Sequence, residues 1–163
     1  MPKGGARRQK SEYGQQFAEK QKLRNGYGLR ERQFHNYFKK AQKPDDVFNL
    51  LEMRLDSVVY RLGFAMTRPM ARQMVGHKHI TVNGKVLNTP SYQSKINDVV
   101  GIRLAHTQRG IFIDLDERLK KHQAPTWIRL DKEKKEGTVV GRAAVEEAGM
   151  EVNIHSVIEF YSR

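Results

Sequence analysis

Apolar residues in the first half of the chain recur at intervals of three and four, the pattern that predicts amphipathic helices. Residues that cap or break helices separate these stretches. Four helices are expected: one from Ser11 to a break at Gly26 and Gly28, one ending at Pro44, one from Asp45 or Asp46 to Gly63, and one from Thr67 to Gly76. The apolar face of the third consists of Leu51, Leu55, Val58 and Leu62, which predicts one continuous helix.

Alternating apolar residues predict strands in the second half. Ile80–Leu87 contains two β-prone stretches around Asn83-Gly84, a dipeptide typical of a two-residue type I′ hairpin. Val99–Leu104 is expected to close a small sheet with this hairpin. Trp127–Leu130 and Gly137–Val140 are expected to be strands that flank a charged turn.

Two segments have a less decisive pattern. Apolar alternation within residues 107–122 suits a strand, whereas Asp116 and Lys120, four residues apart, favour a helix, which is the interpretation we adopt. This helix is expected to end before Pro125. Residues 157–161 form a last apolar element whose type the pattern leaves open.

Composition narrows the function classes. The 163 residues allow one ordinary domain or two small ones. With 30 Lys and Arg against 18 Asp and Glu the net charge is +12, so a polyanion such as nucleic acid is the expected partner. There is no cysteine, which excludes disulfides and thiolate zinc sites. No apolar segment is long enough to span a membrane, so we expect a soluble, intracellular protein without a membrane partner.

The positive charge is concentrated at the N-terminus. Residues 1–40 hold eleven Lys and Arg and three Glu, a net charge of +8. Residues 1–12 include Arg7, Arg8 and Lys10 and have no apolar periodicity, which predicts a flexible basic arm. The alternative, a merely solvated tail, stays open.

Aromatic residues are interpreted as core. Phe34, Tyr37, Phe38 and Ala41 fall at i, i+3, i+4 and i+7, the spacing of a packed helix face. A platform on which nucleic-acid bases stack is the alternative.

A basic edge is expected where the fourth helix meets the hairpin. Ala71, Met74 and Val75 are expected in the core, and Arg68 and Arg72 share a different face of that helix. The residues expected to contact phosphate or sugar at this edge are Arg68, Arg72, His77, Lys78, His79 and Lys85. A metal site on the histidines is disfavoured because no carboxylate or cysteine lies at ligand spacing. A solvated basic edge without a ligand remains the alternative.

Several motifs resemble one known family in order along nearly the whole chain. They are Ser11-Glu12-Tyr13-Gly14, Tyr27-Gly28, Arg54-Leu55-Asp56, Val58-Val59-Tyr60-Arg61-Leu62-Gly63, Thr67-Arg68, Val82-Asn83-Gly84-Lys85, Pro90-Ser91-Tyr92 and Glu159-Phe160-Tyr161-Ser162-Arg163. The sequence is similar to the S4 family of bacterial and organellar small-subunit ribosomal proteins. It departs from the family at Lys78, where many members have glycine, and at Arg142–Glu146, where a Pro-x-Arg-Glu type stretch is common.

The resemblance implies an α+β fold: a helical domain with an inserted RNA-binding module of two helices, a β-hairpin and a small antiparallel sheet. The implied domains are residues 13–46 with 131–163 for the helical part and 47–130 for the module. The resemblance implies no catalysis, no cofactor and no metal. The implied partners are the 16S-type ribosomal RNA of the small subunit, messenger RNA near its entry pore and neighbouring small-subunit proteins, in the ribosome of the cytoplasm or of an organelle.

With this resemblance, the residues expected to contact RNA are Arg7, Arg8, Lys10, Lys20, Lys22, Arg30, Arg54, Arg61, Arg68, Arg72, His77, Lys78, His79 and Lys85. A pseudouridine synthase is the rival enzyme hypothesis, because Arg54-Leu55-Asp56 repeats the context of a catalytic aspartate in such enzymes. Asp56 is more simply a partner for Arg54 or Arg61 on an amphipathic helix. A stand-alone RNA-binding or chaperone protein that carries the same module is the third possibility.

Overall fold

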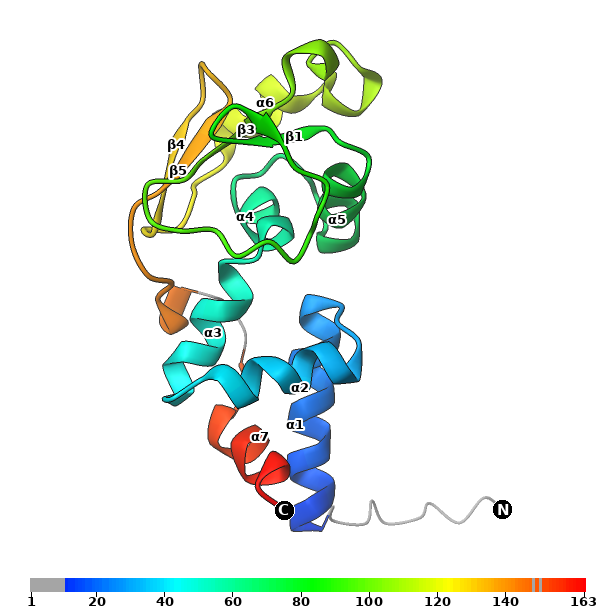
Figure 1. The fold of residues 1–163 in the computed structure, drawn as a ribbon, viewed down its shortest axis with the longest axis vertical. Coiled ribbons are helices and arrows are strands. Elements are labelled where there is room, and N and C mark those ends of the chain that lie inside the picture. The colour runs from blue at the N-terminus through cyan, green and yellow to red at the C-terminus, as the bar shows by residue number, and fades with distance from the viewer. Residues whose placement is uncertain (1–10, 148, 150) are drawn as a thin grey trace, which may run out of the picture. The chain divides into compact units, whose positions relative to one another are not determined.

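The chain folds into two compact units, one built from the residues up to Pro44 with the C-terminal residues, the other from Asp45–Gly149 (Figure 1). The structure, a computed structural model, describes residues 11–147, 149 and 151–163. Arg7, Arg8 and Lys10 of the predicted arm lie outside the described residues. The α+β class is confirmed.

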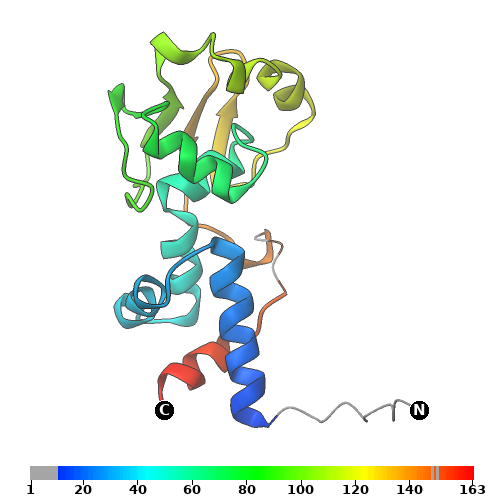
Figure 2. The same cartoon turned by 90° about the vertical axis from the view of Figure 1, so that its right-hand side faces the viewer.

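The first unit is helical. Its helices are α1 (Glu12–Tyr27), α2 (Glu31–Lys40) and α7 (Ile154–Tyr161). The Ser11 side chain accepts a hydrogen bond from the backbone N–H of Gly14, which confirms the predicted start of α1. The apolar element at 157–161, whose type the sequence left open, belongs to the helix α7. This helix packs against α1 and α2 (Figure 2).

The second unit packs helices on an antiparallel sheet. The helices are α3 (Pro44–Glu52), α4 (Leu55–Arg61), α5 (Arg68–Gly76) and α6 (Leu115–Lys121). The strands are β1 (Ile80–Val82), β2 (Lys85–Val86), β3 (Val99–Ile102), β4 (Ile128–Asp131) and β5 (Glu136–Val139), in the order β2-β1-β3-β5-β4. Buried side chains of α4 and α5 join those of the sheet in one apolar core.

The hairpin and the start of α5 are as predicted. Val82 pairs with Lys85, and Asn83 and Gly84 between them have φ of 51° and 82°, as a type I′ turn requires. The Thr67 hydroxyl accepts a hydrogen bond from the N–H of Met70 and so caps α5. Both features depend on neighbouring residues alone.

The prediction of one helix from 45 to 63 is wrong, because the chain breaks between α3 and α4 at Met53 and Arg54. The N–H of Leu55 donates to the carbonyl of Tyr92, and the N–H of Ser94 donates to the carbonyl of Met53. Backbone groups that a continuous helix would use internally therefore bond to a loop almost forty residues away. The apolar spacing is continuous across the break and carries no sign of it.

The resemblance implied a domain boundary at 131, whereas the structure divides the chain after Gly149. Residues 131–149 lie in the second unit, because β5 pairs with β3 as well as with β4 and so completes the sheet of that unit. The helix predicted within 107–122 is present only as α6, after two short 3-10 turns at Leu104–His106 and Gly110–Phe112. Asp116 pairs with Lys135 of the β4–β5 turn, not with Lys120.

Candidate nucleic-acid interface

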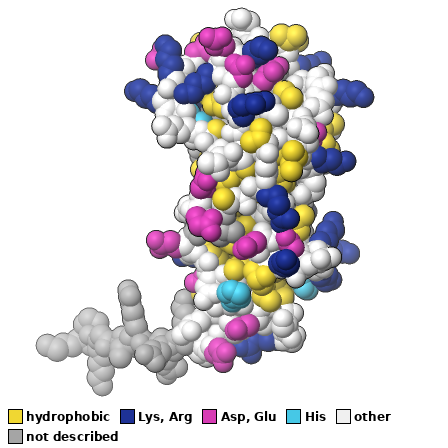
Figure 3. Space-filling view, turned by 90° about the vertical axis from the view of Figure 1, so that its left-hand side faces the viewer, with side chains coloured by type: hydrophobic (Ala, Val, Ile, Leu, Met, Phe, Trp, Pro, Cys, Tyr) yellow, Lys and Arg dark blue, Asp and Glu magenta, His cyan; other side chains and the backbone are white. Residues whose placement is uncertain are grey.

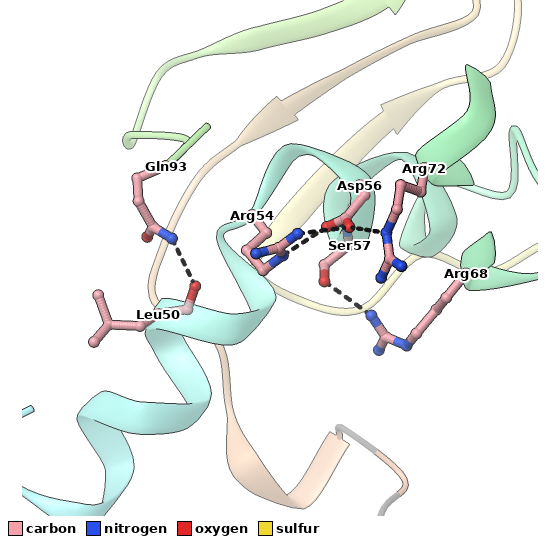
Figure 4. Close-up of polar contacts among 7 residues, drawn as sticks. All are labelled: Leu50, Arg54, Asp56, Ser57, Arg68, Arg72 and Gln93. Atoms are coloured by element: carbon pink, nitrogen blue, oxygen red, sulfur yellow. Dashed lines mark hydrogen bonds and ion pairs between the residues drawn. The ribbon is translucent and has the colours of Figure 1, made fainter. Parts of the chain in front are cut away.

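A buried carboxylate, Asp56, holds two arginines of the second unit (Figure 4). Arg54 donates to both carboxylate oxygens of Asp56, with N–O distances of 3.0 Å, and its side chain is 3% exposed. Arg72 reaches the same carboxylate from α5 through Nε at 3.4 Å. The predicted pairing of Asp56 with Arg54 is confirmed.

Glu52 holds a second pair of arginines and is fully buried, at 0% exposure. Arg61 donates to both of its oxygens, at 3.0 and 2.8 Å, and Arg68 to one of them at 3.3 Å. The Arg68 guanidinium also donates to the Ser57 hydroxyl at 2.8 Å (Figure 4). Its Cζ atom lies 4.7 Å from the centre of the Tyr60 ring, a cation–π contact.

These contacts change the interpretation of the predicted arginines. Arg68 and Arg72 lie off the Ala71, Met74 and Val75 face as expected, but both reach back to buried carboxylates. Arg54 is inside the fold, so we correct its assignment from RNA contact to structural partner. Arg61 and Arg68 are mostly buried, at 16% and 12% side-chain exposure, and Arg72 presents the larger surface at 36%.

Cations that are exposed or half-buried lie where the hairpin meets the end of β3. Lys78, Val86, Asn88 and Arg103 line a groove of about 390 Å³. Lys85 on β2 is exposed, as is His77 at the end of α5. We use the name basic groove for Lys78 and Arg103, which line it, together with Lys85, an exposed cation of the adjoining strand β2 that is outside the lining. Three cations on adjoining turns and strands suit a run of phosphates.

Arg103 was missed by sequence reasoning, as was exposed Arg109. The signal was available for Arg103, a basic residue directly after a predicted strand. On the face drawn in Figure 3, basic and acidic side chains are interspersed over the 45–149 unit. Basic charge alone therefore does not locate an RNA-binding surface on this face.

Lys78 adopts the left-handed conformation, with φ of 66°, at the turn between α5 and β1. This conformation costs a residue with a side chain about 1–2 kcal/mol relative to glycine. The strain explains why glycine suits this position in the family that the sequence resembles. This chain has lysine at the position despite the strain, and the Lys78 side chain lines the groove.

Lys78→Gly is expected to raise the free energy of unfolding by about 0.5–1 kcal/mol, the relieved strain less the entropy of a freer unfolded chain. Urea unfolding measures the change, with Lys85→Gly in the strand β2 as the control that should show no gain. A Lys78→Gly protein less stable than its parent would contradict the strain argument.

His79 is buried and faces inward, so we also correct its assignment to RNA contact. Its Nδ1 lies 2.9 Å from Nδ1 of His106, and its ring packs edge-on against Phe112. One Nδ1 must donate and the other accept at this distance. Within the residues that the structure describes, no group of three or more histidines and carboxylates is placed to hold a metal ion.

Stability should fall below pH about 6.5 because of this histidine pair. Burial lowers the pKa of His79, helped by His106 and Arg109, and burial with Arg109 and Arg103 lowers the pKa of His106. The unfolded chain, with an ordinary histidine pKa near 6.5, therefore binds more protons than the folded one as the pH falls through this range. Urea unfolding between pH 7 and 5 should show a shallower decline for His106→Gln than for the parent. Exposed His155→Gln is the control, and an equal decline in all three proteins would contradict the assignment.

In the first unit, Lys20 is likewise a structural residue. Its side chain is 7% exposed and its Nζ lies 2.9 Å from a carboxylate oxygen of Glu31. Burial acts to raise the pKa of Glu31, but the hydrogen bonds from Lys20 and Tyr161 hold it below its ordinary value. The predicted RNA contact of Lys20 is therefore corrected. Lys22 and Arg30 are exposed, as an RNA contact needs, and Lys22 donates to the carbonyl of Glu151.

No helix among the described residues combines the length and the apolar character needed to cross a membrane.

Two family models match the first hundred residues of this chain, and known proteins match almost all of it. A family model described as the S4 domain matches residues 53–100, and one described as the ribosomal protein S4/S9 N-terminal domain matches residues 2–55. Small ribosomal subunit protein uS4 of Roseiflexus sp. (strain RS-1) is 46% identical over 164 residues, covering 96% of this chain and 80% of that protein. The uS4 protein of Chromobacterium violaceum is 44% identical over 165 residues, and the alignment covers 98% of this chain and 80% of that protein.

Proposed function

We propose that this chain, which belongs to the uS4 family of small ribosomal subunit proteins, is a primary binder of the small-subunit RNA and nucleates its assembly. Family membership confirms the resemblance seen in the sequence, and it makes the chain a ribosomal protein and not an enzyme. The observation that carries the proposal is the basic groove, which lies within a unit that matches the S4 domain over residues 53–100.

The rival enzyme hypothesis has no support in the geometry of Asp56. A pseudouridine synthase needs its aspartate open to a base that has left the helical stack. Asp56 is 4% exposed and accepts hydrogen bonds from Arg54, Arg72 and the N–H of Ser57. The Asp56 carboxylate therefore has a structural role, as the acceptor of these hydrogen bonds.

We propose different roles for the cations of the second unit. Lys78, Lys85 and Arg103 contact phosphates directly, and Arg72 adds a cation that Asp56 orients on α5. Recognition then depends on RNA shape and junction geometry, because the edges of bases are hidden in A-form helices and these side chains read phosphate rather than sequence.

The test compares two charge-matched triple variants in binding to a transcript of the 5′ domain of 16S-type RNA. Lys78→Ala, Lys85→Ala and Arg103→Ala together remove the basic groove. Lys120→Ala, Lys121→Ala and Lys134→Ala remove the same charge from exposed positions on α6 and the β4–β5 turn. The groove variant should bind at least about tenfold more weakly than the control, given that each lost phosphate contact weakens binding. Equal affinities would overturn the assignment of the groove.

For the N-terminal arm we propose contact with messenger RNA near the entry pore. The support is the net charge of +8 within residues 1–40 and the family resemblance. Subunits carrying Arg7→Ala, Arg8→Ala and Lys10→Ala should assemble normally but translate a stable hairpin more slowly than an unpaired control message. Equal rates for variant and parent on both messages would contradict this role.

A further inference from the structure

The exposed turn of the β1–β2 hairpin is an Asn-Gly pair, Asn83-Gly84. Glycine has no side chain to shield its backbone nitrogen, so this nitrogen can approach the side chain of the preceding residue closely. In a flexible chain, an asparagine before glycine is therefore prone to lose its side-chain amide. The sequence has one other such pair, Asn25-Gly26, which lies in α1.

In the folded chain the Asn83 amide is engaged with residues 98 and 99. Its Nδ2 donates to Oδ1 of Asp98 at 3.0 Å, and its Oδ1 accepts from the N–H of Val99 at 2.9 Å. The backbone N–H of Asn83 donates to the carbonyl of Val99 at 2.8 Å. These contacts hold Asn83 against the start of β3. Attack by the nitrogen of Gly84 on the side chain requires them to break.

The hairpin is built in a way that favours local opening. Its second strand, β2, consists of Lys85 and Val86, lies at the edge of the sheet and is exposed. A short exposed strand opens at a lower free energy than the buried core. Asn83 can therefore become reactive without unfolding of the whole unit.

A carboxylate at position 83 would not fit the folded hairpin. Asp98 is 8% exposed, and it accepts hydrogen bonds from the N–H of Lys95 at 2.9 Å and from the Tyr92 hydroxyl at 3.0 Å. Burial acts to raise the pKa of Asp98, but the hydrogen bonds from Lys95, Asn83 and Tyr92 hold it below its ordinary value. Asp98 is therefore ionised at neutral pH. Loss of the Asn83 amide would replace its donor by a second negative charge at hydrogen-bond distance.

We propose that Asn83 is a deamidation site that the folded hairpin protects, and that its conversion impairs RNA binding through the hairpin. The nitrogen of Gly84 attacks Cγ of Asn83, a new N–C bond forms, the Cγ–Nδ2 bond breaks, and ammonia leaves with the proton of the Gly84 nitrogen. Water then opens the cyclic imide to aspartate or to isoaspartate, in which the backbone is one carbon longer. Either product disturbs the turn that positions Lys85. Only this last step, the effect on RNA, rests on the proposed function.

The first test measures protection. Asn25→Gln leaves Asn83 in the only Asn-Gly pair of the sequence and serves as the reference protein. Peptide mapping by mass spectrometry follows its conversion at mildly alkaline pH with and without urea. The folded protein should convert at least about tenfold more slowly than the unfolded one, because only the opened hairpin reacts. Equal rates would overturn the proposal.

The hydrogen bond to Asp98 is tested in the same assay. Asp98→Asn, added to the reference protein, weakens the hold on the Asn83 amide. It should speed conversion of the folded protein and leave the rate in urea unchanged. A folded Asp98→Asn protein that converts no faster than the reference would contradict protection by this contact.

The second test measures the consequence in converted protein from which the urea has been removed. Its midpoint of urea unfolding should lie at least about 0.5 M below that of the unconverted protein. It should bind the 5′-domain transcript at least about threefold more weakly, since Lys85 no longer holds its phosphate contact. Asn83→Asp should reproduce the effect of the charge, and adding Asp98→Asn should restore part of the loss. Asn25→Asp, the same change at the other pair, is the control and should shift the midpoint less.

Converted protein with an unchanged midpoint and an unchanged affinity would overturn the proposal. If the unconverted protein does not bind the transcript, the proposed function fails instead. The conversion rates and the urea midpoints still decide the deamidation site in that case, because neither measurement involves RNA.

Discussion

Glu52→Ala is expected to lower the free energy of unfolding by about 3–5 kcal/mol, the usual cost of removing one member of a buried ion pair. Glu52 is fully buried, and Arg61 and Arg68 both donate to it. Without the carboxylate, two guanidinium groups that are less than a fifth exposed face each other across the vacated site. The loss therefore combines desolvation of unpaired cations with their mutual repulsion.

Urea unfolding with a constant m-value measures this loss. Asp116→Ala is the matched control, because Asp116 is 69% exposed and its pair with Lys135 should contribute at most about 1 kcal/mol. Glu52→Gln, which keeps the shape and one acceptor, should fall between the two. A Glu52→Ala protein that loses less than the Asp116→Ala control would show that the arginines find other partners.

Gly137→Ala is expected to cost about 3 kcal/mol, the upper range for overpacking a core. A Cβ atom on Gly137 would lie 2.0 Å from Cδ2 and 2.8 Å from Cδ1 of Leu62. Leu62 is fully buried, so its side chain has no room to withdraw without disturbing its neighbours. The clash marks where Leu62, directly after α4, packs against β5.

A double-mutant cycle tests the cause. Leu62→Ala alone should cost about 2–5 kcal/mol because it opens a cavity. Combined with Gly137→Ala, the loss should be clearly smaller than the sum, since each change relieves the other. Gly141→Ala, with no atom within 4 Å of the added methyl group, is the control expected to be near neutral. Additive losses would contradict a direct clash.

Features governed by near neighbours in the sequence could be predicted. The type I′ hairpin depends on Asn83 and Gly84, and the start of α5 depends on Thr67. In both cases the residues that determine the conformation lie within a few positions of it. The strands on either side of the 131–136 turn could be recognised for the same reason.

Features governed by distant segments could not be predicted. The break between α3 and α4 depends on backbone groups of Tyr92 and Ser94. Likewise, the true partner of Asp116 is Lys135, which the β4–β5 turn brings near. The spacing of residues along the chain indicates neither of these contacts.

The candidate site, too, could be predicted only in part. Basic residues could be identified from the sequence, but their burial could not: Lys78 and Lys85 are exposed, whereas Arg54 is enclosed by the fold. A charged residue is normally solvated. The position of Asp56 and the surrounding core explain why Arg54, at the break between α3 and α4, is not.

The salt dependence of RNA binding tests the central claim most directly. Each duplex phosphate that a protein neutralises contributes about 0.9 to the slope of log affinity against log salt concentration. If the basic groove contacts RNA, replacing Lys78, Lys85 and Arg103 by alanine should reduce the slope for the 5′-domain transcript by about 2–3. The variant with Lys120, Lys121 and Lys134 replaced should keep the parent slope. Identical slopes for all three proteins would show that the groove does not bind the RNA.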